Sequence, residues 1–416
     1  MKVYLETYGC TANKSDASLM CGLLKEKNHE LVDTMDDADV LVLVTCTVIG
    51  TTEQRMLSRL KCFKQKHKPI IAAGCMASVQ ADLIRSVVPD AKLLPPRYSH
   101  HLVDVVEEKK VRFTERHKTR LPKWFNDVTA PILIAEGCDS ACSYCITQLA
   151  RGQITSYPTE AIKHDIRFAL EQGCKEIQIT AQDTASYGLD TGANLGYLLS
   201  EICTIDSAFR IRVGMMNPFT ALQQLGNIID AYGDQKIYKF VHLPVQSGDD
   251  AILNLMNRRY TSTDFLDIIK KFRRAYPDIT LSTDVIVGFP TETEEQFDHT
   301  VELVKKTKPD IVNITRYSPR PYTAAKTLRK NVPTDIAKKR SKYLSTLCST
   351  ISTEINRKYL GKTFAALVTE KGKHTTWVGR TENYKPVVLK EQVRPGSFVH
   401  VEIEDVASTF LVGKLI

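Results

Sequence analysis

Three cysteines with a spacing suited to iron–sulfur chemistry lie close together in the sequence. Residues 137–145 read Gly-Cys-Asp-Ser-Ala-Cys-Ser-Tyr-Cys, which places Cys138, Cys142 and Cys145 at the spacing C-x3-C-x2-C. Cysteine thiolates are the usual protein ligands of [4Fe–4S] clusters, and no cysteine follows until Cys174. Three thiolates on one loop would therefore bind three irons and leave the fourth iron open to a small molecule.

Two simpler interpretations of this loop are a zinc site and a group of three buried thiols. Zinc sites usually combine one C-x2-C pair with a distant second pair. The sequence contains no second C-x2-C pair. We therefore favour the cluster with an open iron.

Three further cysteines, Cys10, Cys46 and Cys75, each follow a stretch that favours a β-strand. The strands are expected at residues 3–7, 39–45 and 69–74, and helical patterns at 13–27, 51–66 and 78–87 alternate with them. Such alternation indicates a doubly wound parallel sheet, whose strands end at one edge where ligands bind. This topology would bring together thiols that are 36 and 29 residues apart, and it suggests a second three-cysteine cluster with an open iron.

Cysteine is also often a small buried hydrophobe, and this is the alternative for each of these three. We interpret the other cysteines as structural: Cys21, Cys62, Cys174, Cys203 and Cys348.

A second series of strand and helix patterns begins at Pro131. Six β/α units indicate a partial barrel or a curved parallel sheet, and the 137–145 loop follows its first strand, at the face where barrel active sites lie. The expected strands are 131–135, 175–181, 209–214, 238–245, 279–287 and 310–317. The expected helices are 159–171, 194–203, 220–231, 249–256, 261–274 and 293–306, and a helix over 333–358 leads out of this domain.

The last part of the chain changes to short strands separated by turns such as Pro395-Gly396. The strands are expected at 364–368, 375–380, 386–389, 397–403 and 409–414, which is typical of a small antiparallel barrel. From Arg357 onward this part has ten Lys or Arg against six Asp or Glu. Trp377, Tyr384 and His374 are candidates to stack on bases, with lysines on the nucleic-acid backbone. A purely structural barrel is the alternative.

The chain is therefore expected to be an α/β protein of three domains. Residues 1–100 form the N-terminal α/β domain, 131–356 the central domain and 357–416 the barrel. Residues 101–130 form a basic connector, whose positive charges at 109–120 are suited to contact phosphate.

Composition is typical of a soluble globular protein, and its moderately basic charge is compatible with nucleic-acid binding without proving it. The 416 residues are 43% hydrophobic and 25% charged, with a net charge of +8. No run of about 18 apolar residues and no secretory signal is seen, so we expect a cytoplasmic protein without a membrane partner. Thiols stay reduced there, and the odd total of 11 cysteines argues against a complete set of disulfides.

Taken together, these motifs resemble the radical SAM methylthiotransferases over essentially the whole chain. The resemblance rests on the 137–145 loop, on the three strand-end cysteines and on a C-terminal barrel like a TRAM domain. Further matching stretches are residues 7–14, 44–48, 73–77, 145–147 with Arg151-Gly152, 242–248 and 283–293. Residues 7–13 and 45–54 are similar to the archaeal and eukaryotic branch. Members of that branch convert N6-threonylcarbamoyladenosine (t6A) at position 37 of tRNA to its 2-methylthio derivative.

The resemblance implies two [4Fe–4S] clusters and S-adenosylmethionine as cofactors of a radical reaction at C2 of the adenine. Cys138, Cys142 and Cys145 would be the catalytic ligands that hold the cluster to which S-adenosylmethionine binds. Cys10, Cys46 and Cys75 would hold the cluster that presents the sulfur.

Four residues are predicted to contact S-adenosylmethionine. They are Tyr144 within the signature loop and Gln182, Gln246 and Asp284, which end strands near the presumed cavity. The expected partners are the anticodon stem-loop of tRNA, an electron donor and a sulfur source. Base 37 would have to leave the base stack to enter the cavity.

Other functions fit parts of the same pattern. One alternative is a methylthiotransferase for isopentenyladenosine-37 of tRNA or for an aspartate of a ribosomal protein. An alternative of another class is a non-catalytic, RNA-binding iron–sulfur sensor.

Overall fold

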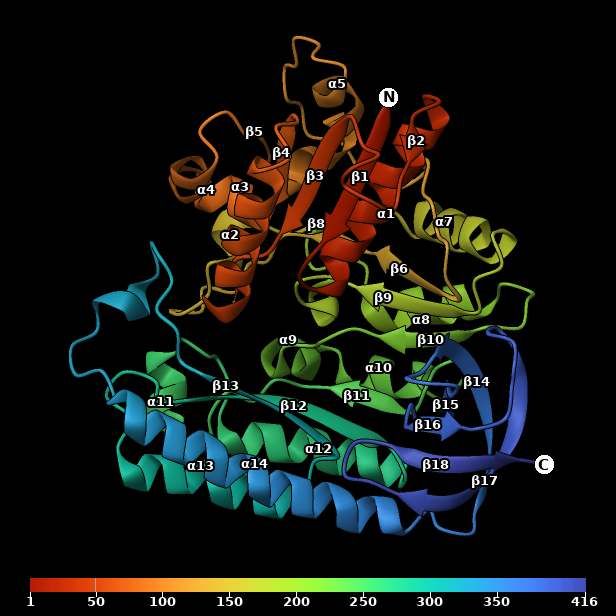
Figure 1. The fold of residues 1–416 in the computed structure, drawn as a ribbon. Coiled ribbons are helices and arrows are strands. Elements are labelled where there is room, and N and C mark those ends of the chain that lie inside the picture. The colour runs from red at the N-terminus through yellow and green to blue at the C-terminus, as the bar shows by residue number, and fades with distance from the viewer. Residues whose placement is uncertain (49) are drawn as a thin grey trace.

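The computed structural model describes residues 1–48 and 50–416, and its N-terminal part is a five-stranded parallel sheet. The strand order is β2-β1-β3-β4-β5 (Figure 1). The strands are β1 (Lys2–Thr7), β2 (Glu30–Leu31), β3 (Val40–Thr45), β4 (Ile70–Gly74) and β5 (Lys92–Leu94). The helices around them are α1 (Thr11–Glu26), α2 (Gly50–Lys64), α3 (Cys75–Val79), α4 (Ala81–Val87), the 3-10 helix η1 (Pro96–His101) and α5 (Leu102–Val106).

Alternate residues of β3 show why this sheet is covered on both faces. Val40, Val42 and Val44 pack with α1 and α5, whereas Leu41 and Leu43 pack with α2 and α4. Because successive side chains of a strand point to opposite faces, a continuous apolar run needs cover on both sides. The expected doubly wound sheet is confirmed.

Two local expectations for this domain are wrong. The helix expected at 78–87 is interrupted at Gln80, which has φ −137° and ψ 39° and separates α3 from α4. The buried Gln80 side chain accepts a hydrogen bond from Thr47 and donates one to Glu53, so tertiary contacts break the helix. The segment expected as a connector begins with helix α5, whose Leu102 and Val106 are buried against α1.

The central domain is a curved set of six parallel strands in the order β6-β9-β10 and β11-β12-β13. A bridge between Ile211 and Ile237 joins the two triplets, so the expected partial barrel is confirmed. The strands are β6 (Thr129–Leu133), β9 (Glu176–Thr180), β10 (Arg210–Val213), β11 (Phe240–His242), β12 (Thr280–Val287) and β13 (Ile311–Arg316). A short antiparallel pair, β7 (Ala135–Glu136) and β8 (Thr155–Ser156), flanks the 137–145 loop and α6 (Thr147–Arg151).

Helices follow the central strands close to the expected positions. They are α7 (Thr159–Glu171), η2 (Thr184–Ser186), α8 (Leu195–Cys203), α9 (Pro218–Gln223), α10 (Leu225–Ala231), α11 (Asp250–Leu255), α12 (Ser262–Ala275) and α13 (Glu294–Thr307). The helix expected at 220–231 is wrong in one respect, because it is divided at Gln224. The buried Gln224 amide donates to the Ala185 carbonyl and accepts from Leu195 N, so this break has the same cause as the break at Gln80.

The chain ends in η3 (Ala324–Thr327), the long helix α14 (Thr334–Arg357) and a closed barrel of order β14-β15-β16-β18-β17. Its strands are β14 (Thr363–Lys371), β15 (Trp377–Thr381), β16 (Pro386–Leu389), β17 (Phe398–Val406) and β18 (Leu411–Leu415). The barrel is confirmed, but β16 and β18 pair in parallel, so it is not purely antiparallel. No helix in the described residues is long and apolar enough to cross a membrane.

The barrel docks at the N-terminal ends of the central strands, away from the cysteine loop (Figure 1). Tyr384 lies in this contact. Its ring centroid is 4.8 Å from that of Tyr238 and 5.0 Å from that of Phe240, and its hydroxyl donates to Glu176 at 3.1 Å. Tyr384 therefore holds the barrel in place, and its predicted role in stacking on bases is wrong. His374 is exposed, and Trp377 packs partly into the barrel core.

Lys385 makes a second docking contact. Its buried ammonium donates to Asp310 at 2.6 Å and to Asn356 at 2.9 Å.

Lys385→Met should lower the free energy of unfolding by about 3–5 kcal/mol, because it leaves the buried Asp310 carboxylate without its cation. Denaturant unfolding of the full chain measures this. Lys390→Met, which removes an exposed lysine of the same barrel, should change stability by at most about 0.5 kcal/mol. Equal effects of the two variants would contradict the assignment.

Candidate functional site

The 137–145 loop is held at both ends by backbone contacts. Cys138 N donates to Gly152 O at 3.0 Å, and Ser143 N donates to Met256 O at 3.0 Å. Gly137 has φ +86°, and a Cβ at this position would overlap the Gln153 carbonyl. Glycine is therefore required where the loop leaves β7, since only glycine adopts this conformation without a steric penalty.

The sulfur of each cysteine in this loop accepts a hydrogen bond from an N–H group. Ser140 N donates to Cys138 Sγ at 3.4 Å, and Thr147 N donates to Cys145 Sγ at 3.4 Å. The third donor comes from outside the loop: Arg258 Nη1 lies 3.2 Å from Cys142 Sγ. Such donors stabilise a thiolate, the form that binds iron. Burial raises the pKa of the Cys138 thiol to about 12, so binding of a cluster would release protons.

The three N-terminal cysteines occupy the carboxyl edge of the parallel sheet, as expected. Cys10 caps α1, Cys46 follows β3 and Cys75 begins α3. Cys46 lies directly against the backbone next to Cys10, because a Cβ on Gly9 would come within 2.8 Å of Cys46 Cβ. Burial raises the pKa of the Cys75 thiol to about 12, and the charges of Cys10 and Cys46 act on it in the same direction. The topology thus brings these cysteines to one place.

The thiols of the 137–145 loop have a donor set that suits a cluster. In the described residues, no three His, Cys, Asp or Glu side chains converge tightly enough to hold one metal ion. A [4Fe–4S] cluster binds each thiolate through a different iron and therefore needs a wider spacing. The N–H donors to all three loop thiols agree with this donor set.

Asn13 connects all three N-terminal cysteine segments. Its amide nitrogen donates to Tyr8 O at 2.7 Å and to Thr45 O at 2.9 Å, just before Cys10 and Cys46. Its amide oxygen lies 3.8 Å from Cys75 Sγ. Sequence reasoning did not single out Asn13. It lies in the 7–14 motif, and an uncharged polar residue so close to the candidate cluster ligand Cys10 could have indicated a supporting role.

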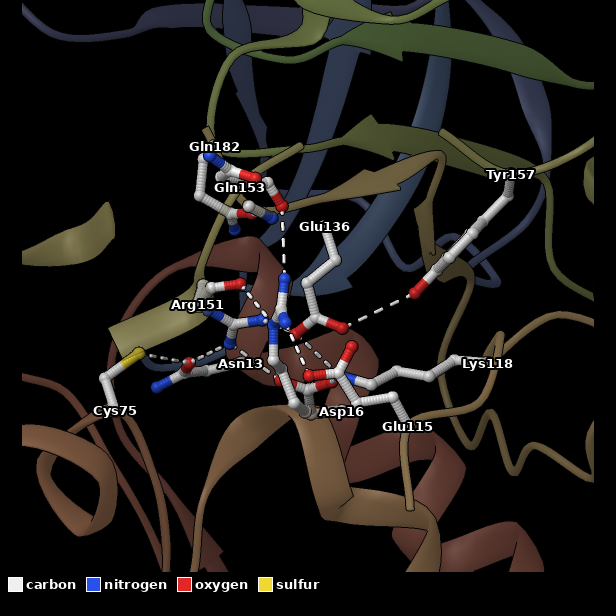
Figure 2. A network of polar contacts seen from close by, with 12 residues as sticks. Asn13, Asp16, Cys75, Glu115, Lys118, Glu136, Arg151, Gln153, Tyr157 and Gln182 are labelled. Atoms are coloured by element: carbon white, nitrogen blue, oxygen red, sulfur yellow. Dashed lines mark hydrogen bonds and ion pairs between the residues drawn. The ribbon is translucent and has the colours of Figure 1, made fainter. Parts of the chain in front are cut away.

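A buried network of charges runs from Asn13, beside Cys75, to Glu136, just before the 137–145 loop (Figure 2). Arg151, at the end of α6, donates to Asn13 Oδ1 at 2.8 Å, to Asp16 Oδ2 at 2.7 Å and to Glu136 Oε1 at 2.9 Å. Lys118 contacts the same two carboxylates at 2.7 and 2.8 Å. Lys118 was expected in a basic connector suited to phosphate, but it is buried in this network.

A cavity of about 350 Å³ is lined by residues of the central domain together with Val48 of the N-terminal domain. Its lining includes Cys145 of the 137–145 loop, whereas Cys10, Cys46 and Cys75 do not line it, and Val48 lies two residues after Cys46. Its remaining lining includes Tyr144, Ile146, His242, Gln246, Asp284, Ile286, Asn313, Arg316, Tyr317 and Arg320. This volume lies in the range of ligand pockets, about 300–1,000 Å³.

Three of the four residues predicted to contact S-adenosylmethionine line this cavity: Tyr144, Gln246 and Asp284. Burial opposes ionisation of Asp284, but hydrogen bonds from His242 at 3.0 Å and Asn313 at 2.7 Å outweigh it and lower its pKa. Gln182 does not line the cavity. Its amide oxygen accepts from Gly137 N at 2.7 Å and so supports the cysteine loop.

Arg320 fastens the N-terminal domain to the wall of the cavity. Its guanidinium donates to Glu53 at 2.8 Å and to Ser318 at 3.1 Å, and Glu53 belongs to α2. The ion pair is nearly buried. Sequence reasoning missed this contact, because nothing in the chain links residues so far apart.

Arg151→Met should lower the free energy of unfolding by about 3–5 kcal/mol, because Asp16 and Glu136 would then share Lys118 as their only cation in the network. Denaturant unfolding of the full chain without cofactors measures this. Arg116→Met removes an exposed arginine of the neighbouring segment and should have little effect. A loss below about 0.5 kcal/mol for Arg151→Met would mean that the network does not hold the domains together.

Comparison with known proteins finds family models that match separate parts of the chain. Three family models match: "Radical SAM superfamily" at residues 132–304, "Uncharacterized protein family UPF0004" at 2–94 and "TRAM domain" at 357–416. The solved radical S-adenosylmethionine methyltransferase TsrM from Kitasatospora setae has a TM-score of 0.57. That match has 13% identity and covers 78% of this chain and 75% of that chain, and it concerns the fold alone.

Curated relatives match over the full length of this chain. One from Pyrococcus horikoshii, called "Probable threonylcarbamoyladenosine tRNA methylthiotransferase", is 42% identical over 100% of both chains. One from Fervidobacterium nodosum, called "tRNA-2-methylthio-N(6)-dimethylallyladenosine synthase", is 33% identical over 100% of this chain and 99% of the relative. With its two cysteine groups, its barrel and this full-length similarity, the chain belongs to the radical SAM tRNA methylthiotransferase family.

Proposed function

We propose that this protein converts t6A at position 37 of tRNA to 2-methylthio-t6A. The observation that carries the proposal is the cavity lined by Cys145 of one cysteine group and by Val48, two residues after Cys46 of the other, because a base held there would lie near both a radical source and a sulfur source. The full-length archaeal relative supports t6A as the target, since it is more similar to this chain than the relative named for dimethylallyladenosine.

Two [4Fe–4S] clusters are part of this proposal. Cys138, Cys142 and Cys145 would hold one, and Cys10, Cys46 and Cys75 the other. When bound, the first supplies the electron for reductive cleavage of S-adenosylmethionine, and the second presents the sulfur, chemistry that no side chain provides. A separate electron donor and a sulfur source complete the set of partners.

The protein itself supplies position and exclusion of water. The Arg320–Glu53 ion pair holds the N-terminal domain against the central domain, and Val48 and Cys145 then face one cavity. Tyr144, Gln246 and Asp284 present an aromatic ring, an amide and a carboxylate to this space, which suits an adenosyl and an amino-acid group. Their contact with S-adenosylmethionine is part of the proposal.

The tRNA would contact the protein at two places. Base 37 must leave the stack of the anticodon loop to enter the cavity, at a cost of a few kcal/mol. The basic C-terminal barrel is the second contact, through the phosphate backbone. We place the reaction in the cytoplasm, where a tRNA substrate is found.

Mass spectrometry of tRNA nucleosides after reaction with the anaerobically reconstituted protein tests the target. We expect 2-methylthio-t6A from tRNA that carries t6A. Formation of 2-methylthio-isopentenyladenosine instead would show that isopentenyladenosine is the target. Methylthiolation of a ribosomal protein, with none of tRNA, would show that tRNA is not the substrate. A protein that releases no 5′-deoxyadenosine with S-adenosylmethionine and reductant would be a sensor and not an enzyme.

Two cysteine variants separate the roles of the two groups. Cys138→Ala should abolish both 5′-deoxyadenosine release and methylthiolation, because it removes a ligand of the radical-generating cluster. Cys46→Ala should keep the release of 5′-deoxyadenosine but lose methylthiolation. Cys62→Ala, in helix α2, is the matched control and should keep both activities. Full methylthiolation by Cys46→Ala would exclude the second cluster.

A further inference from the structure

We propose that Arg316 binds the carboxylate of the threonylcarbamoyl group and thereby selects t6A over uncharged modifications of the same adenine. This inference rests on the proposed function and deepens it. Threonine linked to the base through its amino group keeps a free carboxylate, whereas a dimethylallyl group has no charge. A cavity that distinguishes the two groups therefore needs a cation for the carboxylate.

Three basic side chains line the cavity, and two of them have partners. His242 Nε2 lies 3.0 Å from Asp284 Oδ1, and Arg320 Nη1 lies 2.8 Å from Glu53 Oε2. The third is Arg316, the last residue of β13, whose side chain is exposed. Within residues 1–48 and 50–416, its guanidinium forms no hydrogen bond and no ion pair. Arg316 is thus the cation that remains for a ligand.

Electrostatics favour this arrangement. Asp284, the carboxylate that lines the cavity, accepts hydrogen bonds from His242 and Asn313, and Glu53, which lies outside the lining, pairs with Arg320, so both carboxylates already have protein partners. A ligand carboxylate that entered an apolar space without a cation would lose hydration and gain nothing in return. The planar guanidinium of arginine matches a carboxylate with two parallel N–H donors.

The remaining lining suits the base. Tyr144 and Tyr317 offer aromatic rings, and Ile146 and Ile286 offer apolar surface. An extruded base commonly stacks on such side chains. The adenine would then occupy the apolar part of the cavity, with its modified N6 side directed to Arg316 at the end of β13.

A second carboxylate shares this chemistry, namely that of the methionine part of S-adenosylmethionine. The two sources differ in which substrate depends on Arg316. If the arginine binds the threonylcarbamoyl group, its loss affects RNA binding. If it binds S-adenosylmethionine, its loss affects the cofactor and leaves RNA selection unchanged.

The test compares anticodon stem-loop RNAs that carry either t6A or its neutral methyl ester. Binding to the full-length protein is measured by fluorescence anisotropy, and KM for RNA and for S-adenosylmethionine is measured with reconstituted protein. The wild type should prefer t6A, and Arg316→Met should weaken t6A binding about 10- to 100-fold, the effect of one charged hydrogen-bonding partner, and abolish the preference over the ester. Arg316→Lys keeps the positive charge but loses the bidentate pair of N–H donors, and it should restore part of the preference for t6A over the ester.

Arg329→Met is the matched control, because it removes an exposed arginine of the same domain that does not line the cavity. It should retain the preference of the wild type. The inference would be overturned if Arg316→Met kept the wild-type preference for t6A over the ester, or if it raised only the KM for S-adenosylmethionine. Formation of 2-methylthio-t6A would still support the proposed function in either case. Failure of the wild type to form any 2-methylthio-t6A would instead overturn the proposed function.

Discussion

The arrangement of both cysteine groups depends on one buried guanidinium, that of Arg151. Helix α6 begins two residues after Cys145 and ends at Arg151, so its five residues span only about 7.5 Å. At that end the guanidinium meets Asn13 and Asp16 of helix α1, and Cys75 lies close by. Two cations and two carboxylates balance each other there. Because buried charges are stable only when paired, the two domains fit together in one register.

The sequence alone predicted those features that follow from local pattern. The apolar run 39–45 implied a strand with two covered faces, and parallel topology then placed Cys10, Cys46 and Cys75 at one edge. The cluster motif of Cys138, Cys142 and Cys145 was recognised from its spacing alone, without any assumption about the fold. Tyr144 was chosen from the signature loop and Gln246 and Asp284 from strand topology, and all three line the same cavity, although Asp284 lies in the middle of β12.

Features that depend on long-range partners could not be predicted. Arg151 and Asp16 are 135 residues apart, and no local signal relates them. Gln80 and Gln224 have helical neighbours, yet each interrupts its helix because its amide binds another element. Tyr384 has the composition of a base-stacking residue in a basic barrel, and only the docking of the barrel shows that its ring is occupied. In each of these cases tertiary contact overrides local propensity.

Strand β13 runs from the contact with the barrel to the cavity, and its length sets the distance between these two places. Asp310, just before it, contacts the barrel through Lys385, and Arg316 at its other end lines the cavity. Six residues of extended chain measure about 20 Å. An RNA that touches both the barrel and the cavity is therefore held bivalently. A free nucleoside would occupy only one of the two places, whereas the anticodon arm of the proposed tRNA substrate would gain the effective concentration that links two contacts on one ligand.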